Sequence, residues 1–67
     1  MIEARAELAL VMAKLERLKD DYRDVLTLRL IDALPFDLIA EIMDKTAGNV
    51  RVLYHRAKKA LEALDEK

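Results

Sequence analysis

Apolar positions along this chain recur at steps of three and four residues, which is typical of helices that bury one face. The pattern divides the chain into four such segments, and no stretch alternates apolar and polar residues as a half-buried strand would. We therefore expect an all-α, four-helix domain, with helices at about residues 3–18, 21–33, 36–43 and 47–64.

The boundaries of these segments carry residues that favour helix ends and turns. Asp20 is expected to cap the second helix and Thr46 the fourth, because each side-chain oxygen can accept a bond from an orphan N–H. Pro35 suits the start of the third helix. Asp44 follows that helix where many turns place glycine, and Asp tolerates left-handed dihedral angles better than most residues.

The third and fourth segments have the layout of a helix-turn-helix: a short helix, a turn of about three residues and a longer helix. Ala40 is small where the helices must approach, and Ile39, Met43 and Val50 form the expected shared seam. At 100° per residue the inward stripe of the fourth helix is Val50, Tyr54, Ala57, Leu61 and Leu64. The opposite face carries Gly48, Val52, His55 and Lys59, and Arg51 and Arg56 flank it.

Charge is sorted along the chain, although the 67 residues carry a net charge of only −1. Residues 45–61 contain five Lys and Arg side chains and the only His, and no acid. This segment is therefore where an anionic partner would bind, although cations near a helix C-terminus are also favourable without any partner.

Composition excludes several classes of function. With no Cys, no Ser and one Gly, the chain lacks the common acyl-transfer nucleophiles and cannot build a glycine-rich phosphate cradle. We therefore expect neither an enzyme nor a small-molecule substrate, and neither a cofactor nor a metal site, because His55 has no companion ligand. The uncharged stretch at residues 8–13 is far shorter than the roughly 20 residues that cross a bilayer, so a cytoplasmic protein is expected.

From about residue 8 to residue 64 the sequence resembles region 4 of bacterial sigma factors, in particular the extracytoplasmic-function group. The stretch from Leu34 to Leu61 is similar to the family pattern Leu-Ser-Tyr-x-Glu-Ile-Ala-Glu-Ile-Leu-Gly-x-Ser-x-Gly-Thr-Val-Lys-Ser-Arg-Leu-x-Arg-Ala-x-x-x-Leu. Upstream, the stretch from Leu18 to Arg29 is similar to the family's Leu-Pro-x-x-x-Arg-x-Val-Leu-x-Leu-Arg. The resemblance depends on the joint spacing of Tyr22-Arg23, Leu28-Arg29, Ile39-Ala40, Gly48, Val50 and Arg56-Ala57.

The resemblance implies sequence-specific binding to double-stranded promoter DNA at the −35 element in transcription initiation, with the flap region of core RNA polymerase as partner. An anti-sigma factor is a further partner that it implies. The candidate DNA-binding residues are Lys45, Thr46, Asn49, Arg51, Val52, His55, Arg56 and Lys59. The sequence departs from the family pattern at Leu38, Lys45, Val52 and Leu53, which replace Glu, an apolar residue, Ser and Arg.

The physical roles differ among these residues. Lys45, Lys58 and Lys59 suit phosphates, whereas Arg51 can present a planar fork to guanine and Val52 an apolar contact to a thymine methyl. His55 is either a DNA contact or a solvated residue. Because the sequence pI of about 5.8 is well below that of most DNA-binding domains, we expect the isolated domain to bind DNA weakly, with micromolar or higher Kd.

Two alternatives remain open from the residues alone. The first is that the chain is a protein-interaction module with little DNA binding of its own. The second is that it belongs to another helix-turn-helix group, such as the response-regulator output domains. Five side chains are more apolar than a solvated surface requires, and we expect some to form an exposed patch that receives the polymerase flap or an inhibitor: Leu30, Ile31, Leu34, Leu38 and Leu53. Full burial of all five would exclude that patch.

Overall fold

The computed structural model describes the backbone of residues 2–65 and the side chains of residues 6–64. It consists of α1 (Ile2–Leu15), α2 (Asp20–Leu26), the π-helical segment η1 (Thr27–Ile31), α3 (Phe36–Met43) and α4 (Ala47–Asp65). Residues 2–65 contain no strand, so the all-α, helix-turn-helix expectation is confirmed.

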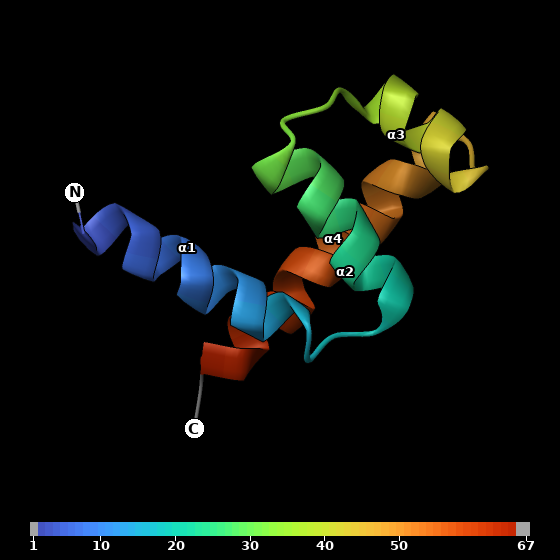
Figure 1. Cartoon of the computed structure of the whole chain (residues 1–67). Helices are drawn as coiled ribbons and strands as arrows, with labels where there is room; N and C mark the ends of the chain where they lie inside the picture. The colour runs from blue at the N-terminus through green and yellow to red at the C-terminus, as the bar shows by residue number, and fades with distance from the viewer. Residues whose placement is uncertain (1, 66–67) are drawn as a thin grey trace.

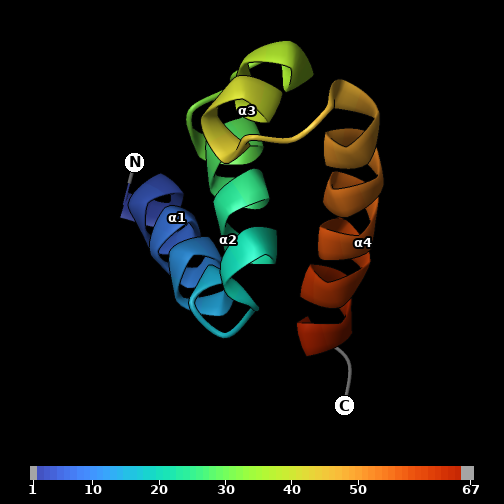
Figure 2. The same ribbon diagram turned by 90° about the vertical axis from the view of Figure 1, so that its right-hand side faces the viewer.

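The helices form a flat bundle, with α2 and η1 lying beside α4 and running in the opposite direction (Figure 2). Helix α3 lies across one end of this pair and packs against the first part of α4 (Figures 1 and 2). Helix α1 contacts α2 and α4 only near its own C-terminal end, and the rest of it extends away from the bundle (Figure 1).

All four helices contribute to one small core. Its members are Leu15 from α1, Val25 and Leu26 from α2, Ile39 and Ala40 from α3, and Val50 and Ala57 from α4. Leu26, Ile39, Val25 and Val50 are the largest side chains fully withdrawn from solvent. The expected stripe on α4 is therefore the face that packs inward, with Tyr54, Leu61 and Leu64 half-buried at its edges.

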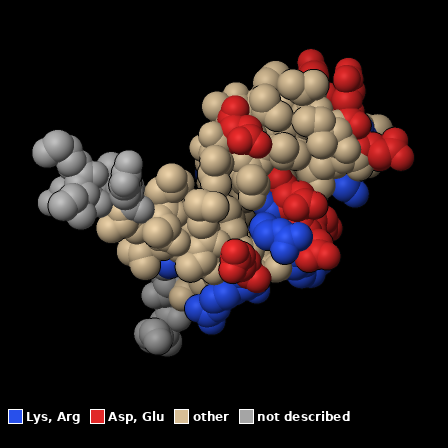
Figure 3. Space-filling model, viewed as in Figure 1, with Lys and Arg blue, Asp and Glu red and all other residues tan. Residues whose placement is uncertain are grey.

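Helix α1 exposes apolar side chains that the bundle does not cover. Leu10 is 62% exposed, and Leu8 and Met12 are each 48% exposed. Figure 3 shows a surface largely without charged side chains over the described part of α1 and the part of this face next to it, whereas Asp and Glu lie at the top and right and mixed charges lie at and below the centre. Burial of α1 therefore depends on its last turns, where Leu15 enters the core.

The α1–α2 connection differs from the expectation. Helix α1 ends at Leu15 instead of Leu18, and tight i to i−3 bonds close the turn: Arg17 N–H to the Lys14 carbonyl at 3.0 Å and Leu18 N–H to the Leu15 carbonyl at 3.1 Å. This geometry keeps Leu18 half-buried beside the core while the chain changes direction.

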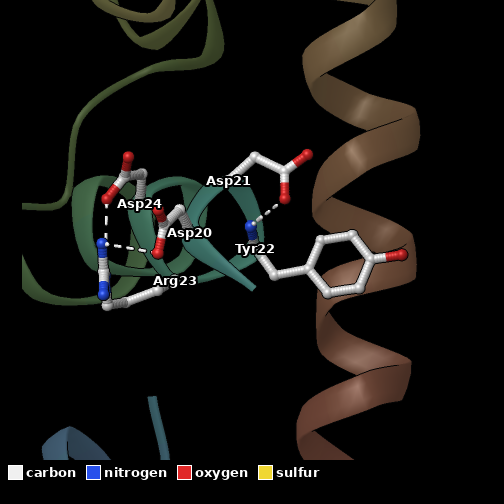
Figure 4. A network of polar contacts seen from close by, with 5 residues as sticks. All are labelled: Asp20, Asp21, Tyr22, Arg23 and Asp24. Carbon is white, nitrogen blue, oxygen red and sulfur yellow. Dashed lines mark hydrogen bonds and ion pairs between the residues drawn. The ribbon is translucent and has the colours of Figure 1, made fainter. Parts of the chain in front are cut away.

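The prediction that Asp20 caps α2 is wrong. The helix begins one residue earlier than expected, so Lys19 is the N-cap and makes no side-chain capping bond. Asp20 is instead inside the first turn, where its Oδ1 lies 3.3 Å from Nη2 of Arg23, one turn later (Figure 4). The adjacent Asp21 accepts the backbone N–H of Tyr22 at 2.9 Å (Figure 4). Both carboxylates still lie at the positive end of the helix dipole.

The second helical segment ends at Ile31 instead of Ala33, and its last five residues are π-helical. The wider turn is closed by the Asp32 N–H to the Thr27 carbonyl at 3.1 Å and the Leu34 N–H to the Leu28 carbonyl at 3.0 Å. Ala33 stops the helix in the left-handed region, with φ 57°. A residue with a Cβ is strained in that conformation, so the connection to α3 is held by its surroundings.

The α3–α4 turn follows the expectation closely. Asp44 adopts the left-handed conformation, with φ 58° and ψ 49°. Lys45 N–H donates to the Ala40 carbonyl at 2.8 Å and Asp44 N–H to the Glu41 carbonyl at 3.3 Å, which is the bonding of a Schellman motif. Thr46 then caps α4, because its Oγ1 accepts the Asn49 N–H at 3.1 Å. The turn therefore sets where α4 begins relative to α3.

Candidate nucleic-acid interface

The outer face of α4 presents the predicted DNA-binding residues to solvent. Arg51, Val52, His55, Arg56 and Lys59 are all exposed, and Val52 leaves 51% of its surface free. Lys45, Thr46 and Asn49 are exposed as well, at the turn and in the first turn of the helix. The fold thus gathers all eight predicted residues on the α3–α4 turn and α4, and buries none of them.

Thr46 has a structural partner, since its hydroxyl oxygen accepts the Asn49 N–H. Its side chain positions the beginning of α4 and fixes the backbone from which Asn49 projects. The neighbouring Gly48 lies on the same outward face, and a Cβ built there would meet no atom within 4 Å. Packing inside the domain therefore does not require glycine at this position, and its absent side chain leaves room for a partner to approach the backbone.

Arg51 lies beside an aromatic ring of α3. Its guanidinium carbon lies 5.9 Å from the centroid of the Phe36 ring, on the side of α4 that faces α3. The Phe36 ring also contacts Tyr54 of α4 edge to face, with centroids 5.4 Å apart. Phe36 is not among the predicted DNA-binding residues, although an aromatic residue in the first turn of the shorter helix was a usable signal.

Arg29 ties the η1–α3 connection to the same ring. Its Nη1 donates to the Leu34 carbonyl at 2.9 Å, and its guanidinium carbon lies 4.3 Å from the Phe36 centroid. A single half-buried side chain thus bridges η1, the strained Ala33 connection and the first residue of α3. This contact holds α3 against the rest of the bundle.

The expected apolar patch is not excluded by burial, because none of its five side chains is fully buried. Leu30 is 48%, Leu38 40% and Ile31 38% exposed, and Leu34 and Leu53 are half-buried. The three exposed members, which we call the η1–α3 patch, come from two elements that pack against each other. Their exposure marks a surface that could contact another protein.

An open groove of about 480 Å³ lies between the beginning of α2 and the end of α3. Its apolar lining includes Leu28, Ile42 and Met43. Asp20, Asp21 and Asp24 line one side of it, and both Asp20 and Asp24 pair with Arg23. Lys45 is the one cation among the described residues that line it, but three carboxylates against one ammonium leave the groove acidic and disfavour nucleic acid inside it.

In the part of the chain that the structure describes, no helix is both long enough and apolar enough to cross a membrane. No group of three or more His, Cys, Asp or Glu side chains there is arranged to hold a metal ion.

Known proteins share sequence with most of this chain. Residues 8–61 match the protein family described as Sigma-70, region 4. The chain is 40% identical over 53 residues to the extracytoplasmic-function (ECF) RNA polymerase sigma-E factors of Escherichia coli strain K12, Salmonella typhi and Shigella flexneri. The aligned segment covers 79% of this chain and 28% of each relative, and no solved structure matches. The chain therefore belongs to the sigma-70 region 4 family.

Proposed function

We propose that this domain binds the −35 element of promoter DNA through α4, as part of a sigma factor that directs core RNA polymerase to a promoter. The observation that carries the proposal is the outer face of α4, where cations and polar groups are exposed and acids are absent from residues 45–61. In a helix-turn-helix the second helix enters the major groove with its N-terminal part. Such a role belongs in the bacterial cytoplasm, where promoter DNA lies.

Seven of the eight residues divide by the chemistry that each can supply, and the eighth, Arg51, can present its guanidinium to guanine or to a phosphate. Lys45 and Lys59 suit phosphates as flexible point charges, and Lys58 joins them. Asn49, Val52, His55 and Arg56 face outward over the first three turns of α4, where they can reach base edges. Thr46 acts through the cap, by fixing where α4 starts.

Fluorescence anisotropy with a duplex containing a −35-like sequence tests this function. For about five neutralised phosphates, log K against log salt should have a slope near −4.5. Arg56→Gln should weaken binding, whereas Arg17→Gln, which removes the same charge from the exposed α1–α2 turn, should leave it within about twofold after correction for net charge. Equal losses in the two variants, or binding indifferent to salt, would contradict the proposal.

The η1–α3 patch is an exposed apolar surface, which is typical of a site that binds another protein. We propose that the η1–α3 patch (Leu30, Ile31 and Leu38) is covered by core RNA polymerase or by an anti-sigma factor. Leu30→Asp should weaken binding of the domain to purified core RNA polymerase in a co-elution assay. Leu8→Asp is the matched control, because both side chains are 48% exposed but Leu8 lies on α1. Unchanged binding in Leu30→Asp would remove the patch from the polymerase interface.

A further inference from the structure

Phe36 is the point where η1, α3 and α4 meet through one aromatic ring. Arg29 of η1 lies 4.3 Å from its centroid, Arg51 of α4 lies 5.9 Å from it, and Tyr54 of α4 packs against it edge to face at 5.4 Å. The first two distances are within the range in which a cation is attracted to the ring face. One side chain therefore contacts two cations, of which Arg29 is also fixed by its hydrogen bond to the Leu34 carbonyl.

The position of Arg51 around α4 explains why it reaches Phe36. At 100° per residue, Arg51 lies about 100° from the buried Val50, whereas Val52 and Lys59 point almost directly away from the core. Lys58 follows Arg51 by two turns on the same flank, and its Nζ lies 5.5 Å from the centroid of Tyr54. The aromatic pair thus borders a row of two cations on the side of α4 that faces α3.

We propose that Phe36 is a positioning residue, which holds the exposed Arg51 guanidinium against α3 so that it meets a backbone phosphate at the edge of the groove. The inference deepens the proposed DNA-binding function and rests on it. In a helix-turn-helix the first helix crosses the phosphate backbone while the outward face of the second reads bases. A cation held beside α3 therefore faces phosphate, and the planar-fork contact to guanine falls to residues further outward.

The advantage of this arrangement is a smaller loss of conformational freedom on binding. A free Arg side chain loses much rotamer entropy when it is immobilised on a phosphate, and part of that loss is already made in the folded domain. The ring contact leaves the charge exposed and available to DNA. Phe36 thus contributes to DNA affinity although it carries no charge.

The test compares Phe36→Leu, which keeps an apolar side chain without the ring, with Phe36→Tyr, which keeps the ring. Phe36→Leu should weaken DNA binding about two- to fivefold, the range expected for an exposed cation–aromatic contact. It should also reduce the magnitude of the salt slope by up to about 0.9, as if one phosphate contact were lost, although the net charge is unchanged. Phe36→Tyr should retain both the affinity and the slope.

A double-mutant cycle with Arg51→Gln separates positioning from general stability. If Phe36 acts through Arg51, Phe36→Leu should add little further loss once Arg51 is Gln. Both single variants should weaken binding to −35-like and scrambled duplexes by the same factor, because a phosphate contact carries no sequence information. All variants should be compared at a temperature at which thermal unfolding shows each of them to be folded. If Phe36 only stabilised the fold, Phe36→Leu would leave the salt slope of the folded domain unchanged.

Nuclear magnetic resonance of the free domain gives a readout that needs no DNA. The Arg51 side-chain protons should show a ring-current shift in the wild type that is lost in Phe36→Leu. No such shift, additive losses in the cycle, or an unchanged slope in Phe36→Leu would overturn the positioning role alone. A wild-type domain that fails to bind any duplex would instead overturn the proposed function, and the inference with it.

Discussion

Helices α1 and α4 are both long and rich in Leu and Ala, but they relate to the core in opposite ways. Helix α4 buries Val50 and Ala57 and keeps its cations outside. Helix α1 buries only Leu15 among its described side chains and leaves Leu8, Leu10 and Met12 about half exposed or more. Apolar content alone therefore does not decide burial, because a helix buries a face only where neighbouring elements lie along it.

The largest expected difference between the bundle and α1 is in the unfolding free energy lost on matched Leu→Ala substitutions. Leu26→Ala in α2 removes a side chain with no exposed surface and should cost about 2–5 kcal/mol of unfolding free energy, enough to unfold much of so small a domain. Leu10→Ala, the same change at a side chain 62% exposed, should stay within about 0.5 kcal/mol. Urea unfolding followed by circular dichroism measures both, and equal effects would abolish the distinction between α1 and the bundle.

Leu15→Ala tests the main anchor of α1, beside which the half-buried Val11 also packs against the core. The substitution should cost about 2–3 kcal/mol and should release α1 preferentially, because Leu15 is the only buried side chain among those described in this helix. Amide hydrogen exchange should show lost protection in α1 and retained protection in α2 and α4. Uniform loss across all helices would show instead that α1 and the bundle unfold as one unit.

Thr46→Ala removes the cap at the beginning of α4 and should cost about 1 kcal/mol, because the Asn49 N–H then has no side-chain partner. Thr46→Ser keeps the hydroxyl and should retain most of the stability. Thermal unfolding separates the two. A neutral Thr46→Ala would mean that solvent replaces the capping bond without loss.

The smallest expected effect on the free energy of unfolding is a gain in stability. Ala33→Gly should stabilise the domain by about 0.5–1 kcal/mol, because glycine adopts the left-handed conformation of Ala33 without strain. Ala63→Gly is the control, since Ala63 lies in α4 in ordinary helical geometry and should lose up to about 1 kcal/mol. A destabilised Ala33→Gly variant would show that the methyl group makes a compensating contact.

Local chemistry predicted much of the α3–α4 half of the molecule. The Thr46 cap, the left-handed Asp44 and the inward stripe through Val50 each depend on neighbouring residues in sequence, so the pattern was sufficient to locate them. The predicted DNA-binding residues within α4 are exposed for the same reason, since the period of α4 places them opposite that stripe or on its flanks, and Lys45 and Thr46 are exposed in the turn before it. Their individual roles toward DNA remain predictions.

The first half of the molecule was predicted less well. The end of α1 at Leu15, the π-helical turn and the left-handed Ala33 are not signalled by residue preferences, because alanine ordinarily avoids that conformation. Asp20 was a reasonable cap by type, but the helix starts one residue earlier and its carboxylate pairs with Arg23. In each case packing of Leu18, Leu28 or Leu34 against the core accompanies the departure from local preference.

The sequence by itself determined the helical class, the helix-turn-helix and the acid-free basic segment, because these follow from periodicity, caps and the order of charges. Only the tertiary structure decided that Phe36 meets both Arg29 and Arg51, and that α1 is held by its last turns. Such contacts join residues distant along the chain, and no local preference encodes them. They arise when the four helices bury their apolar faces together, which fixes where each remaining side chain lies.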